Sequence, residues 1–153
     1  MCPNCRAFIT TDDKICPYCQ VVVGPRAADR IPKDVVGGLI PHARQMGEVL
    51  FARLRDLAER HPIIGDVRGK GLLACLELVR DRANKTPLVP PNTDSPLPLQ
   101  IRRKAWDEGI HVMARGSLII LSPPLIAQPE HIQEAVTKLD HVLTWIKSVT
   151  ESA

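Results

Sequence analysis

Four cysteines near the start of this chain constrain its fold more than any other feature. Cys2 and Cys5 form one C-x2-C pair, and Cys16 and Cys19 form a second pair after ten intervening residues. Two residues between cysteines allow one tight turn to direct both sulfur atoms at the same ion, and the longer spacing allows a hairpin to return the second pair. Four thiolates satisfy the tetrahedral preference of zinc and leave no position for water. The spacing therefore predicts a closed, structural zinc ribbon over residues 1–24.

Two other chemistries use paired C-x2-C motifs, and both fit less well. A redox pair normally follows a strand in a larger fold, and iron in a rubredoxin-like site is the remaining alternative. The run MCPNCRAF…DDKICPYCQ resembles the zinc-ribbon segment at the N-terminus of some rhomboid-like membrane proteins. That resemblance covers only about the first 30 residues. The membrane helices of such proteins are absent, so their protease function does not carry over.

Composition narrows the class of protein. The 153 residues carry a formal net charge of +3, and metal-bound thiolates would offset most of it, so no electrostatic footprint for nucleic acid is present. No apolar run approaches the roughly 18–20 residues of a membrane span, and the N-terminus does not resemble a secretory signal. We therefore expect the protein to be cytoplasmic. In the cytoplasm, C-x2-C pairs usually bind metal rather than form disulfides. Residues 25–38, rich in glycine and charge, have the composition of a linker.

The pattern becomes regular from about residue 39. Pro41 suits the first turn of a helix, and apolar residues then recur at three- and four-residue steps until Pro62, where a helix must stop. Gly65, Gly69 and Gly71 follow closely, and they predict a turn-rich stretch. The first regular element is therefore an amphipathic helix that ends before a glycine-rich turn.

A strand, a loop and a second helix follow. Residues 72–79 have the composition of a buried strand, whereas the five prolines within 84–98 predict an exposed loop without regular structure. A short helix is expected at about 99–108, ended by Gly109 in its C-cap region.

The C-terminal part predicts a hairpin and a last helix. Residues 110–113 and 118–121 are short apolar runs joined by a tight turn at 115–117, and Pro123-Pro124 ends the second run. A helix beginning near Pro129 is expected to bury Ile132, Val136, Leu139, Val142, Leu143 and Ile146. The order of elements predicts an α+β fold with helices on one face of a short sheet.

Several single residues have simple structural interpretations. Cys75 stands in an apolar run and is expected to be a small buried hydrophobe. Trp106 and Trp145 lie on amphipathic helices and are expected to pack in the core or at its edge. Arg68 is more typical of a paired surface or interface arginine than of a ligand-binding one.

Residues 39–150 resemble the C-terminal small domain of class III (omega-type) pyridoxal-phosphate (PLP) aminotransferases. The resemblance rests on ARQMG at 43–47, HPIIGDVRGKGLLACLELVRD at 61–81 and EGIHVMARGSLIILSPPLI at 108–126, followed by the closing helix. Together these segments occur in the order and spacing of the family. The resemblance implies an aminotransferase-like α+β domain and, for the intact family, transfer of an amino group to a keto acid.

The catalytic parts that the family requires lie upstream of the matched region. They are the lysine that forms the internal aldimine, an aspartate for the pyridinium nitrogen and a cradle for the phosphate. The five lysines of residues 39–150 do not fall on the catalytic position: Lys70, Lys85, Lys104, Lys138 and Lys147. The resemblance therefore implies PLP as the family cofactor, but no covalent PLP and no transamination by this chain alone.

The resemblance also indicates a substrate contact. Many relatives place a carboxylate-binding arginine after the valine of the first hairpin strand, a position occupied here by Met113, with Arg115 two residues further on. Side chains alternate along a strand, so Arg115 shares the direction of Met113 if the strand extends that far. The alternative is a solvated turn residue. Ile120 stands where relatives acting on ornithine-type substrates carry an arginine, which argues against that subgroup.

Three interpretations of the whole chain follow. It is a partial aminotransferase that either completes the active site of another polypeptide or is a remnant, a zinc-ribbon adaptor without catalysis, or a reading frame that joins two unrelated genes near residues 33–38. A small domain by itself exposes apolar surface. We therefore expect self-association, or a partner subunit that covers this surface, and no membrane or nucleic-acid partner.

Overall fold

The computed structural model describes residues 33–151, and the chain divides into two units, Met1–Gly38 and Leu39–Ala153. The four cysteines of the predicted zinc ribbon lie outside the described residues, so the zinc site remains a prediction. No helix in the described part of the chain has the length and apolarity needed to cross a membrane.

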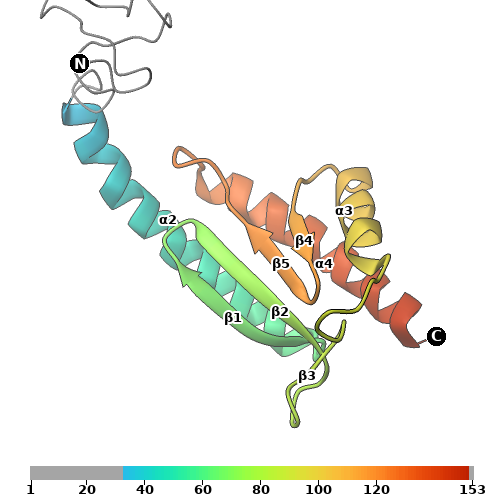
Figure 1. The fold of residues 1–153 in the computed structure, drawn as a ribbon. Helices are drawn as coiled ribbons and strands as arrows, with labels where there is room; N and C mark the ends of the chain where they lie inside the picture. The colour runs from blue at the N-terminus through green and yellow to red at the C-terminus, as the bar shows by residue number, and fades with distance from the viewer. Residues whose placement is uncertain (1–32, 152–153) are drawn as a thin grey trace, which may run out of the picture. The chain divides into compact units, whose positions relative to one another are not determined.

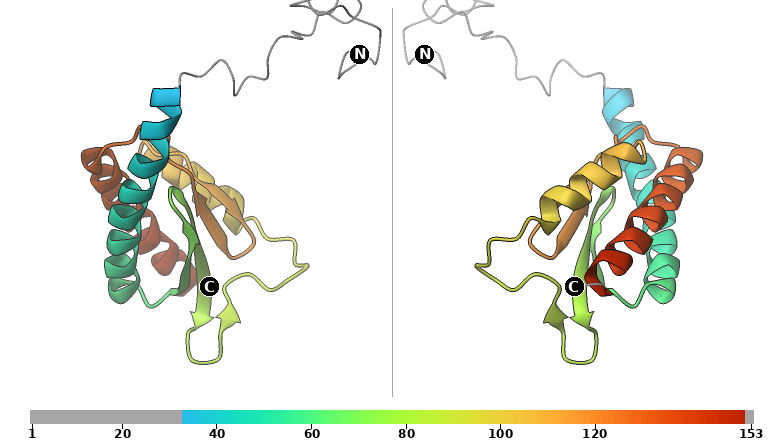
Figure 2. Two further views of the ribbon diagram at one scale, coloured as in Figure 1. Left: turned by 90° about the vertical axis from the view of Figure 1, so that its left-hand side faces the viewer. Right: turned by 90° about the vertical axis from the view of Figure 1, so that its right-hand side faces the viewer.

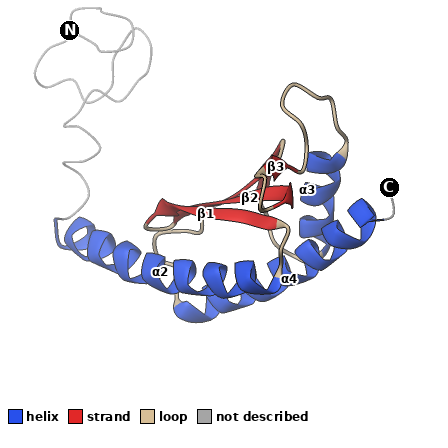
Figure 3. Cartoon of the chain, turned by 90° about the horizontal axis from the view of Figure 1, so that it is seen from below, coloured by secondary structure: helices blue, strands red, loops and turns tan. Residues whose placement is uncertain are grey.

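The described residues form one small sheet with helices packed against it (Figure 1). In chain order, the elements are α2 (Lys33–Arg60), β1 (Ile64–Lys70), β2 (Leu73–Asp81), β3 (Thr86–Pro87), α3 (Leu97–Asp107), β4 (Met113–Arg115), β5 (Leu118–Leu121) and α4 (Pro129–Glu151). All strand pairs are antiparallel in the order β1-β2-β5-β4, and β3 pairs with the end of β2. Helices α2 and α4 cover one face of the sheet, as Figures 2 and 3 show, and α3 lies beside β4. The predicted α+β layer is confirmed for this part of the chain.

The core lies between the sheet and helices α2 and α4. Alternate residues of β2 point into it, and Ala74, Leu76 and Leu78 are fully buried because the side chains of a strand alternate between its two faces. On α4 the apolar stripe predicted from the sequence is buried at every position: Ile132, Val136, Leu139, Val142, Leu143 and Ile146. This confirms that the three- and four-residue periodicity identifies the helix face that packs on the sheet.

Helix α2 begins earlier than the sequence predicted. It starts at Lys33, so Pro41 lies inside the helix rather than in its first turn, and the last six residues of the expected linker are helical. Proline removes one backbone hydrogen bond, and the two glycines at 37–38 cost about 1 kcal/mol each. The helix continues through these residues despite the local costs, so Pro41 does not mark its first turn.

Three other element predictions need correction. The glycine-rich stretch after Pro62 is strand β1, because pairing with β2 satisfies its backbone groups despite the glycines. The first hairpin strand is β4 at Met113–Arg115 rather than 110–113, since its pairing with β5 begins at Met113. The proline-rich segment 84–98, predicted to lack regular structure, contributes the two residues of β3 and the start of α3.

A close approach between α2 and the β1–β2 turn explains two glycines of the matched motifs. A Cβ atom on Gly47 would lie 2.6 Å from the Cα atom of Gly71, which itself has a φ of +58°. No side chain fits at such a distance, so the turn packs directly on the helix backbone. This contact joins ARQMG to GDVRGKG, two segments that are distant in the sequence.

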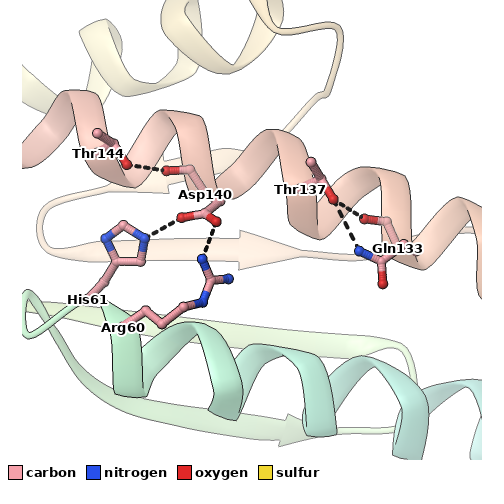
Figure 4. Close-up of polar contacts among 6 residues, drawn as sticks. All are labelled: Arg60, His61, Gln133, Thr137, Asp140 and Thr144. Atoms are coloured by element: carbon pink, nitrogen blue, oxygen red, sulfur yellow. Dashed lines mark hydrogen bonds and ion pairs between the residues drawn. The ribbon is translucent and has the colours of Figure 1, made fainter.

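The C-terminal end of α2 is held by charged side chains (Figure 4). Arg82 donates from Nη2 to the carbonyl oxygen of Ala58 (2.8 Å) in the last turn of α2, where carbonyls lack a partner within the helix, and to that of His61 (3.2 Å) just beyond the helix. His61 donates from Nε2 to Asp140 Oδ1 on α4 (2.5 Å), and Arg60 pairs with the other carboxylate oxygen. Burial alone would raise the pKa of Asp140, but the hydrogen bonds from Arg60 and His61 outweigh it and the pKa is lowered.

Two single-residue expectations differ from the structure. Trp106 is 68 % exposed, although α3 is amphipathic. Within the described residues, its ring makes a T-shaped contact with the ring of His111. Trp145 is half-buried against the core, as expected. Cys75 is half-buried rather than buried, because it alternates with Ala74 and Leu76 and therefore lies on the opposite face of β2.

Candidate functional site on the uncovered face of the sheet

The second face of the sheet is covered by neither α2 nor α4 (Figure 3). Because the core residues of β2 occupy one face, the alternate residues Leu73, Cys75 and Glu77 lie on the other. Leu73 is 58 % exposed, and Met113 on β4 is 56 % exposed. We call this the uncovered face, and it carries both positions that the family resemblance connects with substrate.

The strand register arranges this face in two rows that cross the sheet. In one row the paired positions on β1, β2, β5 and β4 are Arg68, Cys75, Ile120 and Met113. In the other row they are Asp66, Glu77, Leu118 and Arg115. Each row therefore has a charged residue on β1 and an apolar residue on β5. On β4, one row has Met113 and the other has Arg115.

Arg115 and Met113 point the same way, as predicted from alternation along a strand. Both are exposed, whereas Ala114 between them is buried. Arg115 is the last residue of β4 and precedes Gly116, whose φ is +54°. Two strand spacings separate Arg115 from Glu77 in the same row, about 10 Å across the sheet. Arg115 therefore lies on the edge strand β4, whereas the carboxylates Asp66 and Glu77 lie on β1 and β2.

Arg68 forms the charged cluster at the β1 edge. Its Nη1 donates to Asp66 Oδ2 (2.8 Å) and to Glu77 Oε2 (2.5 Å). The two carboxylates raise the pKa of the Arg68 guanidinium further above its ordinary value, chiefly through the hydrogen bond to Glu77. This confirms the interpretation of Arg68 as a paired surface arginine. The exposed fractions of all three side chains exceed a third, so the cluster is screened by solvent.

Cys75 stands opposite Arg68 in the register and has an environment that keeps it a thiol. Burial raises the pKa of the Cys75 thiol, and although Arg68 opposes this, Glu77 and Asp66 add to it. A raised pKa disfavours the thiolate, which is the reactive form of cysteine. Nothing in its surroundings indicates a nucleophile, so Cys75 is a small, partly apolar surface residue.

The five lysines of residues 39–150 lie on β1, α3 and α4 and in the turn between β2 and β3. A Schiff-base lysine must lie in a pocket beside groups for the pyridinium nitrogen and the phosphate. Lys104 and Lys138 pair with Glu108 and Glu134 along their own helices, and Lys70 and Lys85 are exposed. The fifth, Lys147, lies with His61, Arg80 and Arg82 around a hollow on another side of the sheet.

No set of three or more histidine, cysteine, aspartate or glutamate side chains within residues 33–151 is arranged to hold a metal ion. The predicted zinc ligands Cys2, Cys5, Cys16 and Cys19 lie outside the described residues, and the structure does not bear on them.

Sequence reasoning missed the partners of Arg68. Asp66 is two residues away on the same strand, where alternation puts it on the same face, so it was visible in the sequence. Glu77 is nine residues away on the next strand, and its position opposite Asp66 depends on a register that includes a bulge between Ile64 and Asp66. Nothing local in the sequence marks such a shift.

Comparison with known proteins places this fold in a family. Residues 34–143 match the family model described as Aminotransferase class-III. The match covers well over half of the chain, and the chain therefore belongs to the class III aminotransferase family.

Two individual relatives illustrate the similarity. The chain is 38% identical over 113 residues to the taurine–pyruvate aminotransferase of Rhodobacter capsulatus, covering 69% of this chain and 24% of the relative. It is 40% identical over 112 residues to ethanolamine-phosphate phospho-lyase homolog 1 of Caenorhabditis elegans, covering 69% of this chain and 22% of the relative.

Solved structures agree with the sequence matches. The taurine:2-oxoglutarate aminotransferase of Bifidobacterium kashiwanohense, determined with PLP and glutamate, superposes with a TM-score of 0.69 at 30% identity. It covers 73% of this chain, and the chain covers 25% of that structure. The chain thus spans about a quarter of the length of the relatives that it matches.

Proposed function

We propose that this chain is a partial class III aminotransferase whose domain completes a PLP-dependent active site in association with a second polypeptide. The observation that carries the proposal is the uncovered face, which presents Arg115 and Met113 together beside half-buried apolar side chains. The family match supports the aminotransferase class. The chain spans about a quarter of the length of its relatives, which supports a contribution to the active site from further polypeptide.

In this proposal Arg115 binds the anionic group of the substrate. A guanidinium at the end of a short strand can donate two parallel hydrogen bonds to a carboxylate, and the exposed side chain of Arg115 is not held by the carboxylates at the β1 edge. PLP, supplied with the second polypeptide, would carry the amino-group chemistry. The residues of this chain would position the substrate and help to exclude water from one side of the site.

The test is reconstitution with a relative that lacks its own C-terminal quarter, such as the truncated taurine–pyruvate aminotransferase of Rhodobacter capsulatus. The chain alone should show no aldimine absorbance with PLP and no turnover, and the mixture should regain turnover of an amino donor with a keto acid. Arg115→Ala should then reduce kcat/KM by roughly 10- to 100-fold, because a hydrogen bond to a charged group contributes about 1.5–3 kcal/mol.

The control for that test is Arg103→Ala, which removes an exposed arginine from α3. It should leave kcat/KM of the reconstituted mixture unchanged. A trapped lysine adduct with turnover by the chain alone would refute the proposal that it needs a second polypeptide. Equal effects of the two substitutions would refute the role of Arg115.

A structural zinc ribbon remains a separate proposal for residues 1–24. It rests on the spacing of Cys2, Cys5, Cys16 and Cys19. Purified protein should contain one zinc ion per chain, and Cys16→Ser should lose it, since structural sites need all four thiolates. If the ribbon is an adaptor that binds a partner, the same substitution should also abolish capture of that partner. Protein that purifies without zinc would refute the prediction of a zinc ribbon.

The third interpretation concerns the junction of the two parts. The family match begins at residue 34, close to the predicted change of character at 33–38. A continuous DNA sequence across codons 30–40 in independent samples would eliminate a reading frame joined from unrelated genes.

A further inference from the structure

A hollow lies where the C-terminal ends of α2, β2 and α4 come together. Its volume is about 490 Å³, and its lining includes Arg80 at the end of β2, Arg82 just beyond that strand and Lys147 of α4. We call it the arginine hollow. None of the described residues that line it belongs to the two rows of the uncovered face, so it is separate from the candidate site that contains Arg115.

Both arginines of the hollow are held in place by backbone carbonyl groups. Arg80 donates from Nε to the carbonyl oxygen of Leu88 (3.1 Å). Arg82 donates from Nη2 to the carbonyl oxygen of Ile64 (2.5 Å), as well as to two carbonyl oxygens near the end of α2. A guanidinium is a rigid plane with five N–H donors, and these bonds use one nitrogen of each group. The other donors are therefore fixed in direction and make no hydrogen bond within residues 33–151.

The positive charge of the two arginines is not neutralised by a carboxylate. Within residues 33–151, neither Arg80 nor Arg82 forms an ion pair. Among the described residues that line the hollow, only Asp81 is acidic, and its carboxylate accepts hydrogen bonds from the backbone of Ala83 (2.8 Å) and the side chain of Asn84 instead. The C-terminus of α2 offsets about half a charge at Arg82. An anion bound in the hollow would supply the remaining counter-charge.

The lining of the hollow also contains apolar side chains. Pro62 and Ile63, which follow α2, line it together with Leu88. Leu88 is buried and Ile63 is half-buried against the core, so both are fixed by packing. A volume of about 490 Å³ lies within the range of small-molecule sites, roughly 300–1,000 Å³. The hollow therefore suits a ligand with an anionic head and an apolar body.

Two other hollows of similar size lack this combination. The groove along the 122–128 loop has a volume of about 510 Å³, and none of the described residues in its lining is lysine or arginine. The hollow between α2 and β1, of about 460 Å³, contains Arg44 and Arg55, but no hydrogen bond to the rest of residues 33–151 fixes either side chain. Ordering a mobile side chain opposes binding, and this cost is smaller for side chains that are already held, as Arg80 and Arg82 are.

We propose that the arginine hollow binds a small organic phosphate, with the phosphate group on Arg80 and Arg82 and the apolar body against Ile63 and Leu88. A guanidinium matches two oxygens of a phosphate or of a carboxylate. Two guanidinium groups favour a phosphate monoester, which carries a charge of about −1.5 to −2 at pH 7 and has three acceptor oxygens. Because the hollow is separate from the uncovered face, this proposal does not depend on the proposed function.

The test is titration of the full chain with phenyl phosphate, which has both an anionic head and an apolar body. Isothermal titration calorimetry measures the affinity, and inorganic phosphate and phenol test the head and the body alone. Phenyl phosphate should bind more tightly than inorganic phosphate, and phenol should not bind. Arg80→Gln should weaken the binding of phenyl phosphate by roughly tenfold or more, because a hydrogen bond from a charged group is lost. Arg103→Gln, at an exposed position on α3, is the matched control and should bind as the wild type does.

Ile63→Ala tests the apolar part of the site. It should weaken the binding of phenyl phosphate by about threefold or more, since apolar contact area is lost. The binding of inorganic phosphate should stay unchanged. Equal affinities of the wild type for phenyl phosphate and inorganic phosphate would overturn the organic ligand and assign the hollow to free phosphate.

A measurement on the wild-type protein keeps the test independent of variant folding. The Nε–H NMR signals of Arg80 and Arg82 should shift when phenyl phosphate is added, whereas that of Arg103 should not. Shifts confined to other residues would overturn the site even where Arg80→Gln fails to fold. Absence of binding by either phosphate, or equal losses in Arg80→Gln and Arg103→Gln, would also overturn it.

Discussion

The two faces of the sheet are built from the same strands but differ in what they contact. On the covered face, Ala74, Leu76 and Leu78 are fully buried under α2 and α4. On the uncovered face, the alternating residues Leu73 and Cys75 remain at least partly exposed among charged side chains. The covered face therefore contributes the buried apolar area that stabilises the domain, whereas the uncovered face leaves side chains exposed to solvent.

The largest effect should come from a cavity on the covered face. Leu76→Ala should lower the free energy of unfolding by about 2–5 kcal/mol, since the side chain is fully buried and its removal leaves a void. Urea denaturation followed by circular dichroism measures the change. The neighbouring Cys75→Ala, on the uncovered face, should cost less than about 1 kcal/mol. Equal losses at the two positions would contradict the assignment of the faces.

A smaller effect is expected at the ionic contact that joins the helices of the covered side. Asp140→Asn removes a carboxylate that pairs with Arg60 and the buried His61 (Figure 4), and should cost about 1–3 kcal/mol at pH 5. The pKa of Asp140 is lowered on folding, so the carboxylate contributes stability above its unfolded pKa, about 3.9. This contribution is lost as the pH falls through the lower folded value.

The difference in unfolding free energy between wild type and Asp140→Asn should therefore shrink from pH 5 towards pH 2. Urea titrations at several pH values test this. Asp107→Asn, an exposed position at the end of α3, serves as the control and should show no comparable convergence. A difference that stays constant down to pH 2 would show that the charge of Asp140 does not stabilise the helix contact.

The smallest effect belongs to the charged cluster of the uncovered face. Arg68→Ala removes two ion pairs whose partners are largely exposed, so the loss should be about 0.2–1 kcal/mol. The loss should become smaller in 1 M salt, where exposed charges are screened. Thermal unfolding at low and high salt measures it. A loss as large as that of Asp140→Asn, unaffected by salt, would place Arg68 in a buried network instead.

Local patterns predicted much of this fold. The apolar stripe of α4, the buried strand around Leu76 and the glycine after α3 were visible because periodicity and chain stereochemistry are properties of neighbouring residues. The predictions were wrong where contacts with distant parts of the chain override the local preference of a segment. Pairing with β2 turned a glycine-rich segment into β1, and Trp106 is exposed although its helix is amphipathic.

The two parts of the candidate site were predictable to different degrees. That Arg115 and Met113 share a face follows from the alternation of a strand and needed only the correct strand boundary. The pairing of Arg68 with Glu77 depends on a register that is shifted by a bulge. The loop at residues 122–128 is joined to α2 by a hydrogen bond between His42 and Ala127, which are 85 residues apart. No pattern within either segment specifies it.

Spacing and periodicity in the sequence indicated the α+β class, the apolar faces of the helices and the likeness of residues 1–24 to a zinc ribbon. The family followed from the resemblance of the segments at 43–47, 61–81 and 108–126 to known sequences. Only the tertiary structure decided which side of each strand faces water, where Arg115 stands relative to the charged edge, and that the 122–128 loop frames a groove. These features depend on strand register and helix packing, which arise from contacts between segments far apart in the sequence.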